Sequence, residues 1–197
     1  MGEDRPPTRK ERQQQTRRAL LDAARKVVAE RGMLGATHAE IAGAAGVTVG
    51  AIYSNFSSKA DLMVHLLEDA ERAGTVFDAG ASTVRECVAD LGRRLVEQSD
   101  TEPELTVLSL EFVLAAIRDP ETRGRRLPQL QRQHREHAKV LEAIAARSGE
   151  TLPMPALELV EVITDLSWAL LCTRAMLGPD VITESLVLTA LDHCVRP

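Results

Sequence analysis

The chain has few aromatic and few cysteine side chains. It contains one Trp, one Tyr and three Phe among 197 residues. Because proteins that hold single-stranded nucleic acid stack its bases on aromatic rings, this scarcity argues against such a partner. The three cysteines, Cys87, Cys172 and Cys194, are odd in number and far apart. Their spacing predicts free thiols in a reducing compartment rather than a disulfide framework.

Long apolar runs are also absent. No run approaches the about 20 residues of a membrane-spanning helix, and the first residues lack the apolar segment of a signal peptide. We therefore expect a cytoplasmic protein with no membrane partner. The hydrophobic share of 44% and the charged share of 27% are those of an ordinary globular chain of one or two domains. Because no stretch alternates between apolar and polar residues as a strand does, the expected fold class is all-α.

Known catalytic and metal-binding motifs are missing. The sequence has no Gly-x-Ser-x-Gly turn, phosphate-binding loop, Gly-x-Gly-x-x-Gly run, paired Cys-x-x-Cys or His-Glu-x-x-His motif, and no Glu-x-x-His pair for a di-iron bundle. We therefore predict no catalytic residue, no metal site and no cofactor. Two other classes stay open: a helical scaffold protein, and a small bundle enzyme whose polar groups would include His134 and His137.

Charge is distributed unevenly along the chain. The net charge is −5, but residues 1–60 hold ten Lys or Arg and six Asp or Glu, whereas residues 61–197 hold 14 and 23. The amino-terminal part is therefore basic and the remainder acidic. This asymmetry is typical of a protein in which one end meets phosphate groups and the other keeps the molecule soluble.

The basic part contains a stretch, residues 37–59, that reads as two short helices joined by a tight turn. Thr37 and Glu40 have the spacing of a capping box, which predicts a helix start. Gly46 is expected to end this helix, because glycine adopts the left-handed conformation of a helix end without steric cost. The predicted apolar face consists of Ile41, Ala44 and Ala45.

Thr48 is expected to cap the second short helix. Residues three and four apart predict its buried face, which consists of Val49, Ile52 and Phe56. The remaining surface is small, polar and uncharged, and it consists of Thr48, Gly50, Ala51, Tyr53, Ser54 and Asn55. A glycine inside a helix costs about 1 kcal/mol relative to alanine, so Gly50 suggests close backbone approach to a ligand. Lys59 lies in the first turn of the next helix, where a bound phosphate would offset the unfavourable helix dipole.

Two helices joined by a glycine-containing turn form a helix-turn-helix, whose second helix enters the major groove of DNA. The sequence here resembles the tetracycline-repressor (TetR) family of bacterial regulators over roughly residues 10–65. The residues that carry the resemblance are Thr37, Ile41, Ala42, Ala45, Gly46, Val47, Gly50, Ile52, Tyr53, Phe56 and Lys59. The resemblance implies a regulator of transcription, with a three-helix DNA-binding bundle and a larger helical effector and dimerisation domain, about nine helices in all. We place the boundary between residues 1–56 and 57–197.

The resemblance and the exposed pattern together predict contacts with double-stranded DNA, as a palindromic operator. The predicted DNA-binding residues are Thr37, Thr48, Val49, Gly50, Ala51, Tyr53, Ser54, Asn55 and Lys59. Tyr53 and Lys59 are expected at phosphates, the neutral front at thymine methyl groups, and Asn55 at adenine. Ser54 stands where the family commonly has a larger side chain. The basic residues Arg9, Lys10 and Arg12 either reach the DNA or belong to a solvated tail that includes residues 1–8.

The last two helices predicted by periodicity, 157–177 and 181–195, are the most apolar of the chain. Because such helices must be covered on nearly all sides, we expect a homodimer with a four-helix interface. An unknown, apolar small-molecule effector is expected in the carboxyl-terminal domain. The candidate effector-binding residues are Leu108, Phe112, His134, His137, Trp168, Cys172 and Met176. Core packing is the alternative for these residues, as is a solvated face for the acidic stripe of Glu158, Glu161 and Asp165.

Overall fold

The computed structural model describes residues 8–74 and 77–196, and this part of the chain forms helices but no strand. The all-α prediction is thus confirmed, as is the number of about nine helices. The elements are α1 (Arg9–Gly35), α2 (His38–Ala44), α3 (Val49–Asn55), α4 (Lys59–Gly74), α5 (Val84–Thr101), α6 (Pro103–Arg118), α7 (Pro120–Ser148), α8 (Ala156–Leu177) and α9 (Glu184–Cys194).

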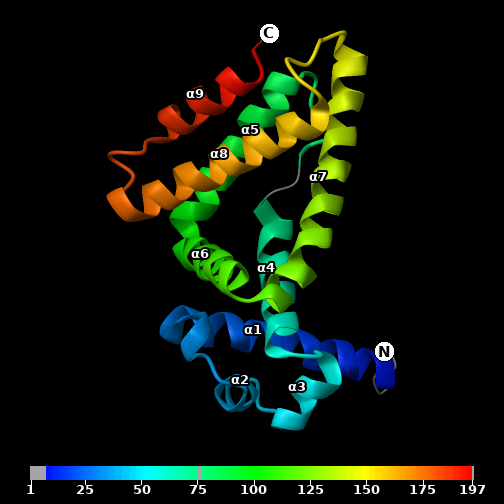
Figure 1. The fold of residues 1–197 in the computed structure, drawn as a ribbon, viewed down its shortest axis with the longest axis vertical. Coiled ribbons are helices and arrows are strands. Elements are labelled where there is room, and N and C mark those ends of the chain that lie inside the picture. The colour runs from blue at the N-terminus through cyan, green and yellow to red at the C-terminus, as the bar shows by residue number, and fades with distance from the viewer. Residues whose placement is uncertain (1–7, 75–76, 197) are drawn as a thin grey trace, which may run out of the picture.

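The molecule is elongated, with α1, α2 and α3 at one end and α5 to α9 making up the larger remainder (Figure 1). Helix α4 leads from the small end into the larger one, and α7 runs along one side of the larger end. None of the helices in residues 8–74 and 77–196 combines the length and the hydropathy that a membrane crossing requires.

Helix α1 begins with a capping box between Thr8 and Glu11, a pair with the same spacing as Thr37 and Glu40. The Glu11 amide donates to Thr8 Oγ1 at 3.2 Å, and the Thr8 amide donates to Glu11 Oε2 at 2.5 Å. The basic residues Arg9, Lys10 and Arg12 are therefore exposed positions in the first turn of this helix, not part of a tail. The predicted arm, residues 1–8, lies outside the described residues except for Thr8.

Helix α1 kinks at Gly32 and then continues. Gly32 has φ 72° and ψ 164°, and helical hydrogen bonding resumes as far as Gly35. The amide of Met33, which the kink releases from the helix, donates to the carboxylate of Glu111 on α6. A side chain from the larger end of the molecule therefore supplies the partner that lets the helix continue.

Buried side chains form two hydrophobic cores. The first core joins α1, α2 and α3 to the first half of α4 and to α6, through Leu105, Leu108 and Phe112. The second core lies among α5, α7, α8 and α9, and it also includes Phe77 and Ala81. Helix α6 therefore packs on the amino-terminal bundle and, through Leu105, also lines a cavity of the larger end.

The carboxyl-terminal helices largely follow the predicted boundaries. Asp119 caps α7 by accepting from the Thr122 amide at 2.9 Å, and α8 ends one residue before Gly178. Helix α9 begins at Glu184 rather than at residue 181, because Thr183 caps it by accepting from the Leu186 amide at 3.2 Å. The predicted second of the two apolar helices is therefore shorter than expected.

Candidate nucleic-acid interface and ligand cavity

The first helix of the helix-turn-helix forms as predicted. The Glu40 amide donates to Thr37 Oγ1 at 3.2 Å and the Thr37 amide donates to Glu40 Oε2 at 3.0 Å, so the capping box is confirmed. Gly46 has φ 68°, which makes the turn. Of the predicted apolar face, Ile41 is buried and Ala45 packs half-buried against the first core, but Ala44 is exposed and Ala42 is buried instead. Ala42 adjoins buried Ile41 on the side of α2 that packs on the first core.

Helix α3 differs from the prediction at its start. Thr48 occupies the N-cap position with an extended backbone, but its side chain makes no capping hydrogen bond. Val49 was expected to be buried, yet its side chain is 39% exposed. A helix of only two turns packs on its neighbours along one side, and Ile52 occupies that side of α3. Phe56 is buried just after the helix. The hydroxyl of Thr48 and the Val49 side chain are consequently available at the tip.

The outer face of α3 is accessible and carries no charged side chain. Thr48, Val49, Gly50, Tyr53 and Ser54 are exposed, whereas Ala51 and Asn55 are half-buried. A neutral surface that ends in a bare glycine allows the backbone to approach another molecule closely.

Tyr53 lies on this face with 59% of its side chain exposed. Its hydroxyl is 3.2 Å from His38 Nδ1, and the two rings meet edge to face with centroids 5.2 Å apart. The contact holds the phenol against α2 while leaving it at the surface.

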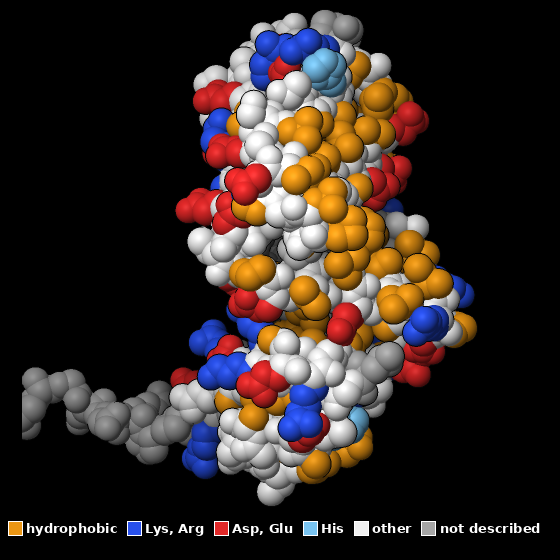
Figure 2. All heavy atoms as spheres, turned by 90° about the vertical axis from the view of Figure 1, so that its left-hand side faces the viewer, with side chains coloured by type: hydrophobic (Ala, Val, Ile, Leu, Met, Phe, Trp, Pro, Cys, Tyr) orange, Lys and Arg blue, Asp and Glu red, His pale blue; other side chains and the backbone are white. Residues whose placement is uncertain are grey.

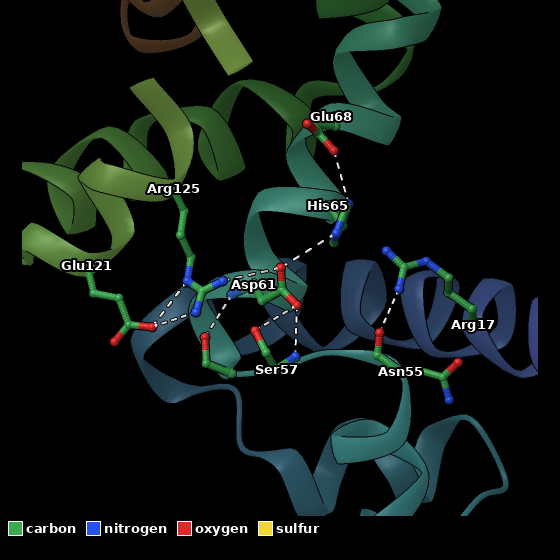
Figure 3. Close-up of polar contacts among 9 residues, drawn as sticks. Arg17, Asn55, Ser57, Asp61, His65, Glu68, Glu121 and Arg125 are labelled. Atoms are coloured by element: carbon green, nitrogen blue, oxygen red, sulfur yellow. Dashed lines mark hydrogen bonds and ion pairs between the residues drawn. The ribbon is translucent and has the colours of Figure 1, made fainter. Parts of the chain in front are cut away.

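Asn55 and Ser54 use their side chains within the protein. Asn55 Nδ2 donates to the carbonyl of Ala51 at 2.8 Å, and Ser54 Oγ donates to the same carbonyl at 3.0 Å. The backbone carbonyl of Asn55 accepts from Arg17 Nη1 at 2.7 Å (Figure 3). Asn55 Nδ2 also donates to Ser54 Oγ at 3.3 Å, so both of its hydrogens are used within the protein and one of these bonds must break before the amide could donate to a base.

Arg17 is a structural residue of this interface that the sequence reasoning missed. Its guanidinium lies 4.3 Å from the centroid of the Phe56 ring while it donates to Asn55. It thereby fastens the end of α3 to α1. A lone arginine amid the polar residues of α1 gives no signal of this role in the sequence.

Lys59 is the first residue of α4, as predicted, and is half-buried. It lines a groove of about 420 Å³ between α1, α4 and α6, together with Arg31, Met33 and Glu111. Partial burial lowers the pKa of its ammonium, while the carboxylate of Glu40 opposes that shift.

A polar network ties the start of α4 to α7 (Figure 3). Asp61 accepts from the Ser57 amide at 2.8 Å, and Arg125 Nη1 of α7 lies 3.8 Å from Asp61 Oδ1. Arg125 also donates to Glu121 at 3.1 Å, and His65 Nε2 lies 3.6 Å from Asp61. Burial acts to raise the pKa of Asp61, but the bonds from Ser57 and the charges of His65 and Arg125 bring it below its usual value.

A cavity of about 140 Å³ lies between α5, α6, α7 and α8. It brings together four of the predicted effector-binding residues, namely His134, His137, Trp168 and Cys172. Leucine side chains make up much of the wall, and they are Leu91, Leu95, Leu105, Leu130 and Leu171.

Three predicted effector-binding residues are not in this cavity. Leu108 and Phe112 are buried in the first core, because their side of α6 faces the amino-terminal bundle. Met176 was assigned with Trp168 and Cys172 from helical spacing, but it is 75% exposed in the last turn of α8, beyond the end of the cavity. Conversely, the sequence reasoning missed Arg126 and Ser167, two buried polar residues of the wall.

Both cavity histidines are shifted toward the neutral form. Burial lowers the pKa of His134, with Glu161 and Asp165 opposing and Arg126 reinforcing the shift. Burial also lowers the pKa of His137, whose ring centroid lies 4.9 Å from that of Phe77. In residues 8–74 and 77–196 no group of three or more His, Cys, Asp and Glu side chains is placed to hold a metal ion.

The surface of α8 and α9 carries both apolar and acidic side chains. Exposed apolar residues of α8, α9 and the segment between them are Leu157, Val162, Trp168, Met176, Leu177, Val181 and Leu186. The acidic stripe of Glu158, Glu161 and Asp165 is solvent-exposed, as its alternative interpretation has it. Figure 2 shows hydrophobic side chains gathered on the face where α6, α9 and one end of α8 lie in Figure 1.

Comparison with known proteins finds sequence similarity in the amino-terminal part of the chain and structural similarity over nearly its whole length. Residues 20–66 match the family model described as bacterial regulatory proteins, tetR family. The chain is 46% identical over 59 residues to the HTH-type transcriptional regulator TtgR of Pseudomonas putida. That match covers 30% of this chain and 28% of the regulator, so it spans less than a third of either protein.

Solved structures are similar over nearly the whole length. A TetR family member from Streptomyces coelicolor is 26% identical, with a TM-score of 0.64 over 92% of this chain and 99% of that one. The regulator FadR from Bacillus subtilis, solved in complex with stearoyl-CoA, is 20% identical, with a TM-score of 0.71 over 90% and 97%. The amino-terminal sequence thus matches the TetR family of bacterial regulatory proteins, and the complete helical fold is similar to that of a solved member.

Proposed function

We propose that the protein is a transcriptional repressor that binds a palindromic operator in double-stranded DNA as a homodimer. The observation that carries this proposal is the accessible, uncharged tip of α3, flanked by exposed Tyr53 on the same helix and by Lys59 at the start of α4. In such a geometry the neutral tip enters the major groove while the tyrosine hydroxyl and the ammonium contact phosphates. A regulator of this kind acts where the chromosome is, so the proposed location is the cytoplasm.

The proposed DNA-binding residues are those predicted from the sequence, and we divide them into residues at the tip of α3 and secondary contacts behind it. Thr48, Val49 and Gly50 form the tip, and a Val49 methyl group suits a thymine methyl. Thr37 serves as a cap and can also reach a phosphate. Ala51, Ser54 and Asn55 stand behind the tip, and the internal bonds of Ser54 and Asn55 make them secondary contacts.

We propose residues 1–56 as the DNA-binding domain and residues 57–197 as the effector and dimerisation domain. The exposed apolar side chains of α8 and α9 support a twofold four-helix interface between two copies. Such a dimer would present two α3 helices about 34 to 36 Å apart, which is one turn of DNA. FadR of Bacillus subtilis is solved with a small molecule, stearoyl-CoA, and by analogy we propose that an effector occupies the cavity lined by His134 and Trp168.

Release of the operator would follow from an effector that favours a different separation of the two α3 helices. Helix α6 supplies the physical connection, because Leu105 and Ser109 line the cavity while Leu108 and Phe112 pack in the first core. A coupling free energy of about 1 to 3 kcal/mol between the sites would weaken operator binding by about 5- to 150-fold.

A salt titration tests the DNA contact. Binding to the DNA upstream of the protein's own gene should weaken steeply between low and physiological salt, because phosphate contacts release counterions. An affinity that barely changes over this range would refute phosphate contact.

Variants locate the contact. Lys59→Ala and Tyr53→Phe should each weaken binding to all DNA sequences. Lys59→Ala should also reduce the slope of log affinity against log salt concentration by about one, because one fewer counterion is released. Lys139→Ala is the matched control, because Lys139 is an exposed lysine on α7 paired with Glu136. If both test variants bind as tightly as the control, these residues do not lie at the interface.

Molecular mass in solution tests the dimer. Leu186→Glu on α9 should convert the dimer to a monomer, because it places a charge in a four-helix apolar interface. Leu127→Glu alters an equally exposed leucine on α7 and should leave the mass unchanged. A monomeric parent protein would contradict the proposed assembly.

A further inference from the structure

The cavity between α5, α6, α7 and α8 has two buried polar atoms that lack a protein partner. His134 is 7% exposed and Ser167 is 3% exposed, and both side chains line the cavity. Among the described residues, neither His134 Nε2 nor Ser167 Oγ has a hydrogen-bond partner. Because an unsatisfied buried polar atom destabilises the folded protein, a matching group on a ligand would be bound favourably here.

Each of the two atoms can pair with a hydroxyl group on a ligand. A serine hydroxyl both donates and accepts, and the second nitrogen of a neutral imidazole either donates or accepts according to its tautomer. A hydroxyl group on a ligand satisfies any such arrangement, since it can donate to one residue and accept from the other.

The charges of the cavity do not favour an anionic or cationic ligand. Arg126 is buried in the wall, but it already has an interaction partner within the protein. Glu102 is also in the wall, and its Oε2 lies 3.9 Å from Nη1 of Arg25 on α1. The two histidines have lowered pKa values because they are buried, so they are neutral near pH 7. A ligand charge would therefore lose its hydration without gaining a free counter-ion.

The size of the cavity sets the size of the ligand. At about 140 Å³ it is close to the about 150 Å³ of an engineered apolar cavity known to take up benzene. Trp168, His137 and Phe77 supply flat rings at its wall, and leucine side chains complete it. This space suits one ring.

From size, charge and the two buried polar atoms together, we propose that the cavity binds a neutral single-ring phenol, whose hydroxyl bonds to His134 and Ser167. This inference rests on the proposed effector role of the cavity and specifies the chemical class that the role requires. The ring of the phenol lies against Trp168 and the leucines, and its hydroxyl points toward α7 and α8.

Trp168 provides a direct assay, because it is the one tryptophan of the chain and lies in the cavity wall. The full-length protein is titrated at pH 7 with 4-methylphenol, with toluene, which lacks only the hydroxyl, and with 4-methylbenzoate, which carries a charge. The fluorescence of Trp168 should respond saturably to 4-methylphenol at a concentration at least about fivefold lower than to toluene. That ratio corresponds to a net hydrogen bond of about 1 kcal/mol. The benzoate should bind more weakly than the phenol.

A pair of serine variants identifies the hydrogen bond. Ser167→Ala should bring the affinities for 4-methylphenol and toluene close together. Ser109→Ala removes another hydroxyl from the same wall, but that hydroxyl already donates to the Leu105 carbonyl at 2.9 Å, so this variant should keep the preference. Circular dichroism checks that both variants are folded.

The proposal is overturned if the parent protein binds toluene or the benzoate as tightly as the phenol, or gives no saturable response. It is also overturned if both serine variants lose the preference equally. DNA binding is measured separately in the same samples. Phenol binding without any effect on DNA binding supports the ligand class and refutes the role of the phenol as effector. Operator binding without phenol binding refutes the ligand class and leaves the proposed DNA-binding function standing.

Discussion

Gly32 is the position at which a single methyl group should damage the protein most clearly. Its φ of 72° with ψ of 164° belongs to a region that residues with a side chain rarely adopt. A Cβ at this position would lie 2.7 Å from Glu111 Oε1, the carboxylate that accepts from the Met33 amide. Gly32→Ala therefore strains the backbone and displaces the group that ties α1 to α6.

The two effects can be estimated separately. The backbone strain costs about 1 to 3 kcal/mol. The carboxylate can swing away, but it then gives up a charge-assisted hydrogen bond worth about 1.5 to 3 kcal/mol, with the lower part of that range suited to a partly buried site. The sum is about 3 kcal/mol, which for a chain of this size corresponds to a fall in Tm of about 6 to 12 °C.

Urea unfolding of Gly32→Ala and of the parent, followed by circular dichroism at one fixed protein concentration, measures the difference. Gly124→Ala is the matched control, because Gly124 lies in α7 and a Cβ there would meet nothing within 4 Å. This control should gain up to about 1 kcal/mol from its higher helix propensity. In a Glu111→Ala background the cost of Gly32→Ala should shrink to the strain alone. A loss below about 1 kcal/mol in the parent background would refute the account of the kink.

Three further predictions concern stability and reactivity. Because burial lowers the pKa values of His134 and His137, the unfolded chain binds protons first, so the free energy of unfolding should fall as pH drops below about 6.5. A flat urea midpoint between pH 7.5 and 5.5 would contradict this. Arg174 is buried and bonded to half-exposed Asp100 at 2.8 Å, so Asp100→Ala should cost about 3 kcal/mol in urea unfolding, because it leaves a buried guanidinium without its counter-ion. Cys87, whose pKa burial raises to about 11, should react with a thiol reagent at pH 8 only after unfolding.

The start and end of most helices could be predicted because they depend on local chemistry. The capping boxes at Thr8 and Thr37 and the turn at Gly46 involve residues within four positions of each other, so their spacing is visible in the sequence. The kink at Gly32 was not predictable in the same way. Its continuation into Gly35 depends on Glu111, which is distant in sequence and reaches the site only in the folded chain.

In the candidate sites too, features set by nearby residues could be predicted, whereas features set by the packing of distant elements could not. Exposure of Tyr53 and the position of Lys59 followed from helical periodicity, whereas the exposure of Val49 depended on how far α3 extends past its neighbours. In the cavity, periodicity correctly placed Trp168 and Cys172 on one face of α8. It could not show where that face stops being covered, and Met176 lies beyond the cavity.

The misplacement of Leu108 and Phe112 has a consequence for the proposed mechanism. Had these residues lined the cavity, α6 would belong to the ligand-binding end alone. Instead their side of α6 is buried in the first core, while Leu105 and Ser109 of the same helix line the cavity. Because close-packed cores transmit displacement instead of absorbing it, a ligand that shifts α6 must also move its partners in the amino-terminal bundle. The bond from the Met33 amide to Glu111 adds a polar connection between the same two parts. Loss of that bond in Glu111→Ala should therefore weaken the effect of an effector on DNA binding more than it weakens binding of the effector itself.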